Sequence, residues 1–91
     1  MKREFKSGDI VKHFKRETLT AAEKAQNKYL YKILCTALNS ETMEEMIVYM
    51  ALYGDFKAYV RPAAMFYSEV DSLKYPDIKQ QYRFEKCEDM T

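Results

Sequence analysis

Tyr59 and Arg61 are the side chains of this 91-residue chain best suited to recognising a ligand. They stand two positions apart, a spacing that puts both on one face of a β-strand. An arginine at a strand end can offer its planar guanidinium to a carboxylate or a phosphate. A neighbouring tyrosine adds a ring that stacks and a hydroxyl that forms hydrogen bonds. The pair predicts a binding surface; the structural alternatives are an ion pair of Arg61 with a loop carboxylate such as Glu41, and a packing role for Tyr59.

His13, the single histidine, is the third candidate. Lys12 and Lys15 stand beside it, so the three side chains could bind an anion together, and an unperturbed histidine titrates near neutrality. Basic side chains outnumber acidic ones over residues 2–16. Such a run is also typical of a solvated face, and a lone strand histidine is often structural or merely exposed.

The sequence contains two residue pairs that could act in catalysis, and neither is well suited to it. Cys35 and His13 could form a nucleophile pair, but Cys35 lies inside an apolar strand pattern, where burial raises the pKa of a thiol and suppresses its reactivity. Glu41 and Asp55 could act as paired carboxylates, yet both lie in predicted turns that fix no working separation. We therefore assign no catalytic residue, and we rank a small hydrolase-type enzyme below the binding functions.

Metal, cofactor and membrane functions find no support in the sequence. Cys35 and Cys87 belong to no CxxC motif, and with one histidine they are too few for a zinc tetrahedron unless carboxylates help. They also form no disulfide framework, which favours a reducing cytoplasm. Ser7-Gly8-Asp9 follow the basic start of the sequence where a signal peptide would need an apolar stretch, and no apolar run reaches about 18 residues, so we expect neither export nor a membrane span. We expect no metal, no cofactor, no membrane contact and a cytoplasmic location.

The elements that would position these residues are mainly strands. Hydrophobic residues make up 47% of the chain and charged residues 32%, which is typical of a folded globular domain. We predict one domain over residues 1–91, with flexible tails at 1–7 and 86–91. Strands are expected over residues 10–14, 29–38, from 45 to the Gly54-Asp55 turn, from that turn to 61, and over 82–84. A capping box, Thr20 to Glu23, predicts a short helix through about residue 27, and residues 63–66 should form a helical turn that covers one end of the sheet.

The register of the predicted hairpin decides which residues share the candidate surface. If Gly54 and Asp55 are the central residues of a type II′ turn, directly opposite residues share a face. One face is then wholly apolar or aromatic and should form the core: Ile47, Tyr49, Ala51, Tyr53, Phe56, Ala58 and Val60. The other face mixes apolar and charged side chains and is where we place a recognition surface: Met46, Val48, Met50, Leu52, Lys57, Tyr59 and Arg61. A longer loop would change this register.

Short motifs along nearly the whole chain point to a family. They are Gly8 with His13-Phe14-Lys15, Tyr31-Lys32-Ile33-Leu34, Ser40-Glu41-Thr42, Val48-Tyr49, Ala51-Leu52-Tyr53-Gly54-Asp55, Val60-Arg61-Pro62, Met65-Phe66 and Tyr82-Arg83-Phe84. Together they resemble the bacterial domain-of-unknown-function family numbered 1653. The resemblance implies a small SH3-like β-barrel or roll of about five antiparallel strands with one or two short helices, and no established activity. Cys35 stands where the pattern tends to have glycine. Asn39 stands where it often has histidine, which removes a possible proton-transfer group beside Glu41.

Two binding functions of different classes follow. The first is a peptide- or protein-binding module, in which the face of Met50, Tyr59 and Arg61, or an exposed strand edge, receives an extended segment. The second is binding of RNA or single-stranded nucleic acid, with Tyr59 stacking on bases and basic side chains holding phosphates. The net charge of +1 leaves few cations for that role.

Binding of a small anion by His13 and Arg61 would use the same residues and is kept as a third alternative. We favour the peptide- or protein-binding module, as a monomer or a weak homodimer that pairs through an exposed edge. The candidate ligand-binding residues are Tyr59, Arg61, His13, Glu41 and Met50.

Overall fold

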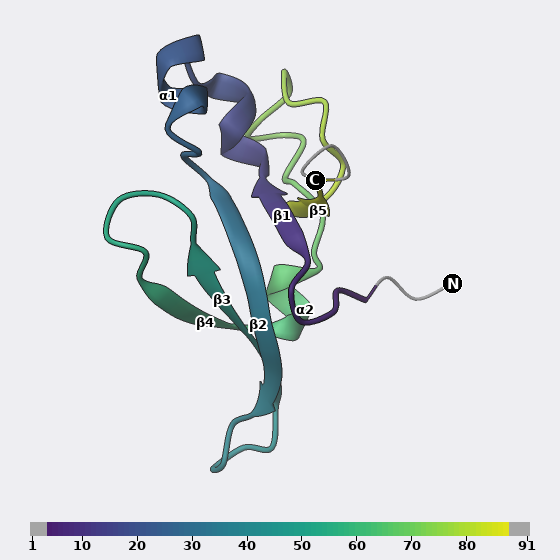
Figure 1. The fold of residues 1–91 in the computed structure, drawn as a ribbon. Helices are drawn as coiled ribbons and strands as arrows, with labels where there is room; N and C mark the ends of the chain where they lie inside the picture. The colour runs from purple at the N-terminus through teal and green to yellow at the C-terminus, as the bar shows by residue number, and fades with distance from the viewer. Residues whose placement is uncertain (1–3, 88–91) are drawn as a thin grey trace.

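A computed structural model describes residues 4–87 of the chain. Its strands form one antiparallel sheet in the order β4-β3-β2-β1-β5 (Figure 1). The strands are β1 (Ile10–His13), β2 (Leu30–Leu38), β3 (Glu45–Ala51), β4 (Ala58–Pro62) and β5 (Phe84–Lys86). The predicted mainly β fold of five antiparallel strands with short helices is confirmed within these residues.

The two edges of the sheet approach each other across the core. β4 and β5 lie at opposite ends of the strand order, yet the Cζ atom of Arg61 in β4 lies 5.7 Å from the centroid of the Phe84 ring in β5. Strand twist, accumulated over the sheet, produces this curl. Over residues 4–87 no pairing between β4 and β5 closes the sheet. The fold is therefore an open roll, compatible with an SH3-like barrel but not closed.

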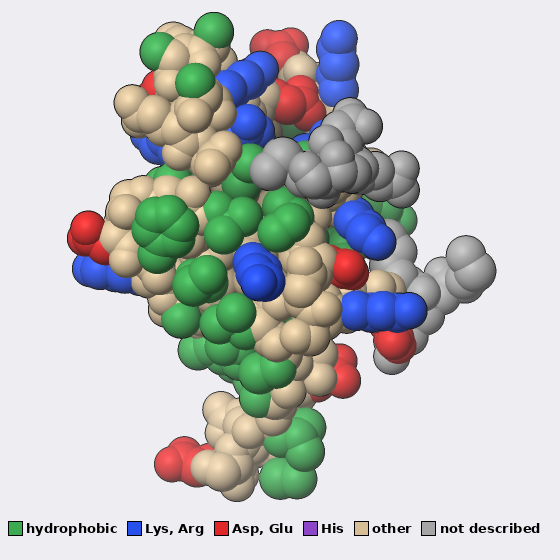
Figure 2. All heavy atoms as spheres, in the orientation of Figure 1, with side chains coloured by type: hydrophobic (Ala, Val, Ile, Leu, Met, Phe, Trp, Pro, Cys, Tyr) green, Lys and Arg blue, Asp and Glu red, His purple; other side chains and the backbone are tan. Residues whose placement is uncertain are grey.

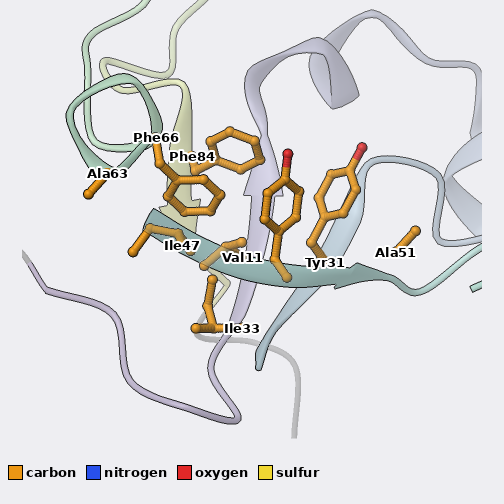
Figure 3. Packing of buried hydrophobic residues seen from close by; sticks show 9 residues of the cluster. Val11, Tyr31, Ile33, Ile47, Ala51, Ala63, Phe66 and Phe84 are labelled. Atoms are coloured by element: carbon orange, nitrogen blue, oxygen red, sulfur yellow. The ribbon is translucent and has the colours of Figure 1, made fainter. Parts of the chain in front are cut away.

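Apolar side chains from β1, β2, β3 and β5 and from α2 (Ala63–Phe66) fill the inner face of the roll. Phe66 and Phe84 stack with ring centroids 4.0 Å apart and planes 6° from parallel. Figure 3 shows the two rings next to each other in the core. α2 thus covers the core as the sequence predicts. The buried cluster consists of Val11, Tyr31, Ile33, Ile47, Tyr49, Ala51, Ala63, Phe66 and Phe84.

The connection from β1 to β2 contains a 3₁₀ helix, η1 (Phe14–Thr18), and a short helix, α1 (Ala21–Ala25). The predicted capping box is confirmed: the Glu23 backbone N–H donates to the Thr20 hydroxyl at 3.2 Å, and the Thr20 backbone N–H donates to the Glu23 carboxylate at 3.0 Å. α1 ends earlier than predicted because Asn27 adopts a left-handed backbone, with φ of 63°.

A bulge in β2 overturns the prediction that Cys35 is buried. Ile33 opposes Tyr49 on the core face, but the register shifts between Ile33 and Cys35, so that Cys35 opposes Val48 and Thr36 opposes Ile47. An extra residue in one strand moves every later side chain to the other face. Cys35 is accordingly exposed on the outer side of the sheet.

The predicted type II′ turn and its register are wrong. β3 and β4 pair Ile47 with Arg61 and Tyr49 with Tyr59, one position away from the register that a two-residue turn at Gly54-Asp55 would give. The loop spans residues 52–57 and contains two positive φ angles, 60° at Gly54 and 56° at Phe56. A slip of one position exchanges the two faces of β4.

Tyr59 and Arg61 therefore project from the core face of the sheet, on the same side as Ile47 and Tyr49. In β3 the predicted core residues Ile47, Tyr49 and Ala51 are buried. In the loop and β4 the prediction fails, since Phe56 is 55% exposed and Val60 59% exposed. On the core face of β4, the side chains are instead those of Tyr59 and Arg61.

Hydrogen bonds of the Glu17 and Gln80 side chains fix the irregular segment over residues 67–83 to the rest of the fold. The Glu17 carboxylate accepts from the backbone N–H groups of Lys79 at 2.9 Å and Gln80 at 2.7 Å. Gln80, which is 8% exposed, donates from Nε2 to the carbonyl oxygens of Lys12 at 3.1 Å and Tyr82 at 2.9 Å. These bonds fix the approach to β5, which begins at Phe84 rather than at Tyr82 as predicted; Tyr82 forms an isolated bridge with Glu69.

The predicted flexible tails lie partly outside the described residues, at 1–3 and 88–91. Within the described part, the Phe5 ring packs edge-on against Phe66 at 5.9 Å between centroids, and Lys86 pairs with Val11 in the sheet. Both ends of the described chain thus contact the roll.

Candidate anion-binding site

The roll has a pocket of about 280 Å³ at the ends of β1 and β4. Four segments contribute to it: the β1–η1 junction, the end of β4, the turn at residues 71–75, and the residue preceding β5. We refer to it as the Arg61 pocket. Its lining residues are His13, Phe14, Lys15, Arg61, Asp71, Lys74, Tyr75 and Arg83. Four of these side chains are cationic and one is a carboxylate, so four of the 15 lysine and arginine side chains of a nearly neutral chain gather around one cavity.

β4 and β5 together position Arg61. The strand register puts its side chain on the core face, and the guanidinium then stacks over the Phe84 ring, a cation–π contact. The pKa of the nearby Tyr49 hydroxyl is raised by burial, and the positive charge of Arg61 opposes that increase. Arg61 is thus held at the rim of the aromatic core with its charge directed toward the pocket.

His13 ends β1 and caps η1. Its Nδ1 accepts from the Lys15 backbone N–H at 3.1 Å, which leaves the proton of the neutral ring on Nε2. Burial lowers the pKa of His13 to about 4, helped by the charges of Arg61, Lys15 and Arg83. His13 is therefore neutral near pH 7, unlike the near-neutral titration that the sequence suggests. It can donate one N–H but adds no positive charge.

The turn at residues 71–75 supplies the opposite wall. Asp71 accepts from the backbone N–H groups of Leu73 at 3.0 Å and Lys74 at 3.2 Å, so its carboxylate is committed to holding the turn. The Tyr75 ring packs edge-on against Phe14 at 4.9 Å between centroids. These contacts set Lys74 across the pocket from the β-sheet.

Among residues 4–87, no ion pair uses a cation of the Arg61 pocket. The ion pairs that join residues within 4–87 are Lys28 with Glu23 at 3.5 Å and Lys86 with Asp9 at 3.7 Å, and neither uses a pocket side chain. Like charges gathered in a concave site attract an anion and raise its local concentration.

The structure brings together two of the five residues singled out in the sequence, His13 and Arg61, and places Tyr59 two positions from Arg61 on the same face of β4, outside the pocket lining. Tyr59 is 45% exposed, and its ring lies 5.8 Å from that of Tyr49. Lys74 and Asp71 could not be identified from the sequence, because they stand outside any regular pattern. Arg83 could be noticed only through its place in the Tyr82-Arg83-Phe84 motif.

Met50 does not share the face of Tyr59 and Arg61, and that part of the predicted surface is wrong. It opposes Lys32 and Ala58 on the outer side of the sheet, where Val60 also lies. Figure 2 shows hydrophobic side chains gathered over the middle of the molecule in the orientation of Figure 1. Met50 lies on the outer side of the sheet by its register and does not line the Arg61 pocket.

Glu41 lies in the turn that joins β2 and β3 and forms no ion pair with Arg61 among those found within residues 4–87. The Asn39 side-chain oxygen accepts from the Glu41 backbone N–H at 2.9 Å. The Asn39 side chain therefore holds this turn.

Cys35 and His13 do not form a nucleophile pair, because Cys35 is on the outer side of the sheet and His13 lines the Arg61 pocket. In the described part of the chain, no group of three or more histidine, cysteine, aspartate or glutamate side chains is arranged to hold a metal ion. No helix of the described residues has the length and apolar character needed to cross a bilayer.

The chain belongs to the family described as "Protein of unknown function (DUF1653)", whose family model matches residues 9–86. That match includes every residue that lines the Arg61 pocket. No curated protein and no solved structure matches the chain. The fold and the pocket together define a small β-roll domain with a cationic cavity.

Proposed function

We propose that this chain is a non-enzymatic binding module, acting in the cytoplasm, that holds a phosphate or carboxylate group of its ligand in the Arg61 pocket. The observation that carries the proposal is the gathering of four cationic side chains around one cavity without ion-pair partners among residues 4–87. The free thiols of Cys35 and Cys87 suit a reducing compartment.

The chemistry of the lining fits an anion better than an apolar ligand. Arg61 offers a planar fork whose direction is set by Phe84, and such a fork matches the two oxygens of a carboxylate or phosphate. The neutral His13 ring adds a single N–H donor, and Lys74 and Arg83 add charge from the other walls.

A single anionic group is favoured over a nucleic-acid strand. Proteins that bind single strands carry a basic groove that follows successive phosphates. Here the cations surround one cavity, and the net charge of the whole chain is +1. The geometry suits one acidic group held firmly.

Titration of the isotope-labelled chain with sodium phosphate and with sodium acetate, against sodium chloride at matched ionic strength, tests the proposal. Phosphate or acetate should give saturable amide shifts at Lys15, Arg61 and Arg83 that chloride does not give. Because a hydrogen bond to a charged group contributes about 1.5 to 3 kcal/mol, Arg61→Gln should weaken binding roughly tenfold or more.

Lys57→Gln is the matched control, since Lys57 is an exposed cation of the 52–57 loop outside the pocket. It removes the same charge and should leave the affinity nearly unchanged. Equal weakening by both variants, or the absence of pocket shifts with both anions, would show that the pocket is not a specific anion site.

A further inference from the structure

β4 is an edge strand whose outward hydrogen-bonding groups can be identified. The Ala51 N–H donates to the Lys57 carbonyl at 2.9 Å, which marks this pair as hydrogen-bonded. Hydrogen-bonded and non-hydrogen-bonded pairs alternate in an antiparallel ladder, so Tyr59 and Arg61 bond to β3. Ala58 and Val60, between them, direct their N–H and C=O groups away from β3.

Pro62 supports this assignment independently. It follows Val60 by two positions, so its ring nitrogen falls on the outward side of β4, where the missing N–H costs the β3–β4 ladder no bond. Within residues 4–87, no backbone hydrogen bond from outside the sheet reaches Ala58 or Val60, and both are exposed. The free edge therefore offers unpaired donors and acceptors next to the Arg61 pocket.

We propose that the free edge of β4 receives an extended peptide as an added strand, and that an acidic group of this peptide enters the Arg61 pocket. This inference rests on the proposed function and names its class of ligand. Arg61 connects the two features, because it is a residue of β4 and also lines the pocket.

The strand geometry brings the acidic group within reach of the pocket. A peptide residue directly opposite Arg61 would share its inner face, with Cβ atoms about 4.5 to 5.5 Å apart. Its carboxylate could then meet the guanidinium. Two positions along, the peptide side chain opposite Tyr59 would contact a ring that is 45% exposed. Backbone pairing supplies affinity, and the pocket selects the acidic side chain.

Other occupants fit the edge less well. A nucleic acid has no alternating N–H and C=O groups to pair with a strand. A second copy of this chain, pairing β4 with β4, would bring no carboxylate to the pocket, because β4 contains no acidic residue. Charge complementarity thus points to an acidic peptide.

Selection from a phage-displayed library of random dodecapeptides on the immobilised full chain tests this proposal. Recovered peptides should share an acidic residue and alternating β-branched or aromatic side chains. The selected peptide is then synthesised with one N-methylated amide at each successive position. N-methylation should weaken binding about tenfold or more at alternate amides of the short segment that pairs with Ala58–Pro62, since it removes a hydrogen bond and blocks strand approach. The intervening amides should tolerate it.

The wild-type protein is unchanged in that measurement, so misfolding cannot imitate the result. A second readout compares the selected peptide with its aspartate-to-asparagine or glutamate-to-glutamine form. Arg61→Gln should weaken the acidic peptide at least tenfold and the amide form little, whereas Lys57→Gln should affect neither.

Three outcomes would overturn the inference: no peptide selected, N-methyl effects without a period of two, or a homodimer that already buries the β4 edge. Tighter binding of oligodeoxythymidylate at Tyr59 and Arg61 would instead favour a nucleic-acid ligand. If phosphate or acetate fills the pocket while peptides fail, the proposed function stands and only this inference falls. If neither anion binds, the proposed function itself fails.

Discussion

Replacing Gln80 with leucine should lower the free energy of unfolding by about 2 to 3 kcal/mol. Gln80 is a buried polar side chain, 8% exposed, and its amide connects the end of β1 to the start of β5. Leucine has a similar size but no donor, so the carbonyl oxygens of Lys12 and Tyr82 would lose their partner in a partly buried place.

The magnitude follows from the two shorter bonds, at 3.1 Å and 2.9 Å. Each such bond contributes about 1 kcal/mol net, and leaving a buried acceptor unpaired adds to the loss. A third contact of the amide, to the Arg83 carbonyl at 3.4 Å, is too long to add much. A domain of this size has a total stability of about 5 to 14 kcal/mol, so the variant should lose a substantial part of it.

Urea denaturation followed by far-ultraviolet circular dichroism measures the change, and the mid-point of thermal unfolding should fall by roughly 10 to 20 °C. Gln81→Leu is the matched control. Gln81 is adjacent and exposed, and its amide reaches only the Glu69 carboxylate at 3.3 Å, so this variant should change stability by less than about 0.5 kcal/mol. Gln80→Glu should destabilise more at pH 7 than at pH 4, because a carboxylate faces carbonyl oxygens and its protonated form does not repel them.

If Gln80→Leu costs no more than Gln81→Leu, the reasoning is refuted. The side-chain bonds of Gln80 would then contribute little, and the position of the segment before β5 would depend on the backbone bonds to Glu17 and on the packing of Phe84.

Two further predictions concern His13 and the capping box. His13 has a pKa of about 4 in the folded protein, below its ordinary value of 6.5, so the unfolded chain binds more protons between those values. Stability should therefore fall as the pH drops from about 6.5 to 4, by about 1 to 2 kcal/mol after allowance for solvent screening. In urea denaturation at several pH values, His13→Asn should remove this part of the pH dependence of the free energy of unfolding. If the free energy of the variant falls with pH as steeply as that of the wild type, the lowered pKa of His13 is contradicted. Thr20→Ala should cost about 0.5 to 1 kcal/mol by removing the capping box, and Thr20→Ser should restore most of it. Equal stability of the alanine and serine variants would show that the cap contributes nothing.

Local sequence signals predicted the elements of the fold well. Thr20 and Glu23 specify a helix start through hydrogen bonds between residues three positions apart, so the signal can be recognised in the local sequence. Ile47, Tyr49 and Ala51 alternate with less apolar residues, and that alternation identifies the buried face of β3.

The faces of β4 could not be predicted in the same way, because they depend on the length of one loop. Phe56 adopts a left-handed backbone, which is uncommon for an aromatic residue and not recognisable from the sequence. It extends the loop and reverses the faces of Tyr59 and Arg61. The β2 bulge moves Cys35 outward for a similar reason.

The pocket was the hardest feature to predict. Lys74 and Arg83 are far from His13 in the sequence, and only the curl of the sheet and the bonds of Gln80 and Glu17 bring them near it. An irregular segment has no sequence periodicity from which its pocket-lining residues could be predicted.

One side of the Arg61 pocket is built on the sheet, and the other side is an exposed turn whose sequence can be replaced. β1 and β4 hold His13 and Arg61 through the sheet, whereas the turn at residues 71–75 is closed by its own Asp71 bonds and carries exposed positions, Leu73 among them at 94%. Protein engineering could therefore alter selectivity by grafting other turns between Asp71 and Tyr75. The scaffold would accept such grafts because no core side chain lies between those two anchors.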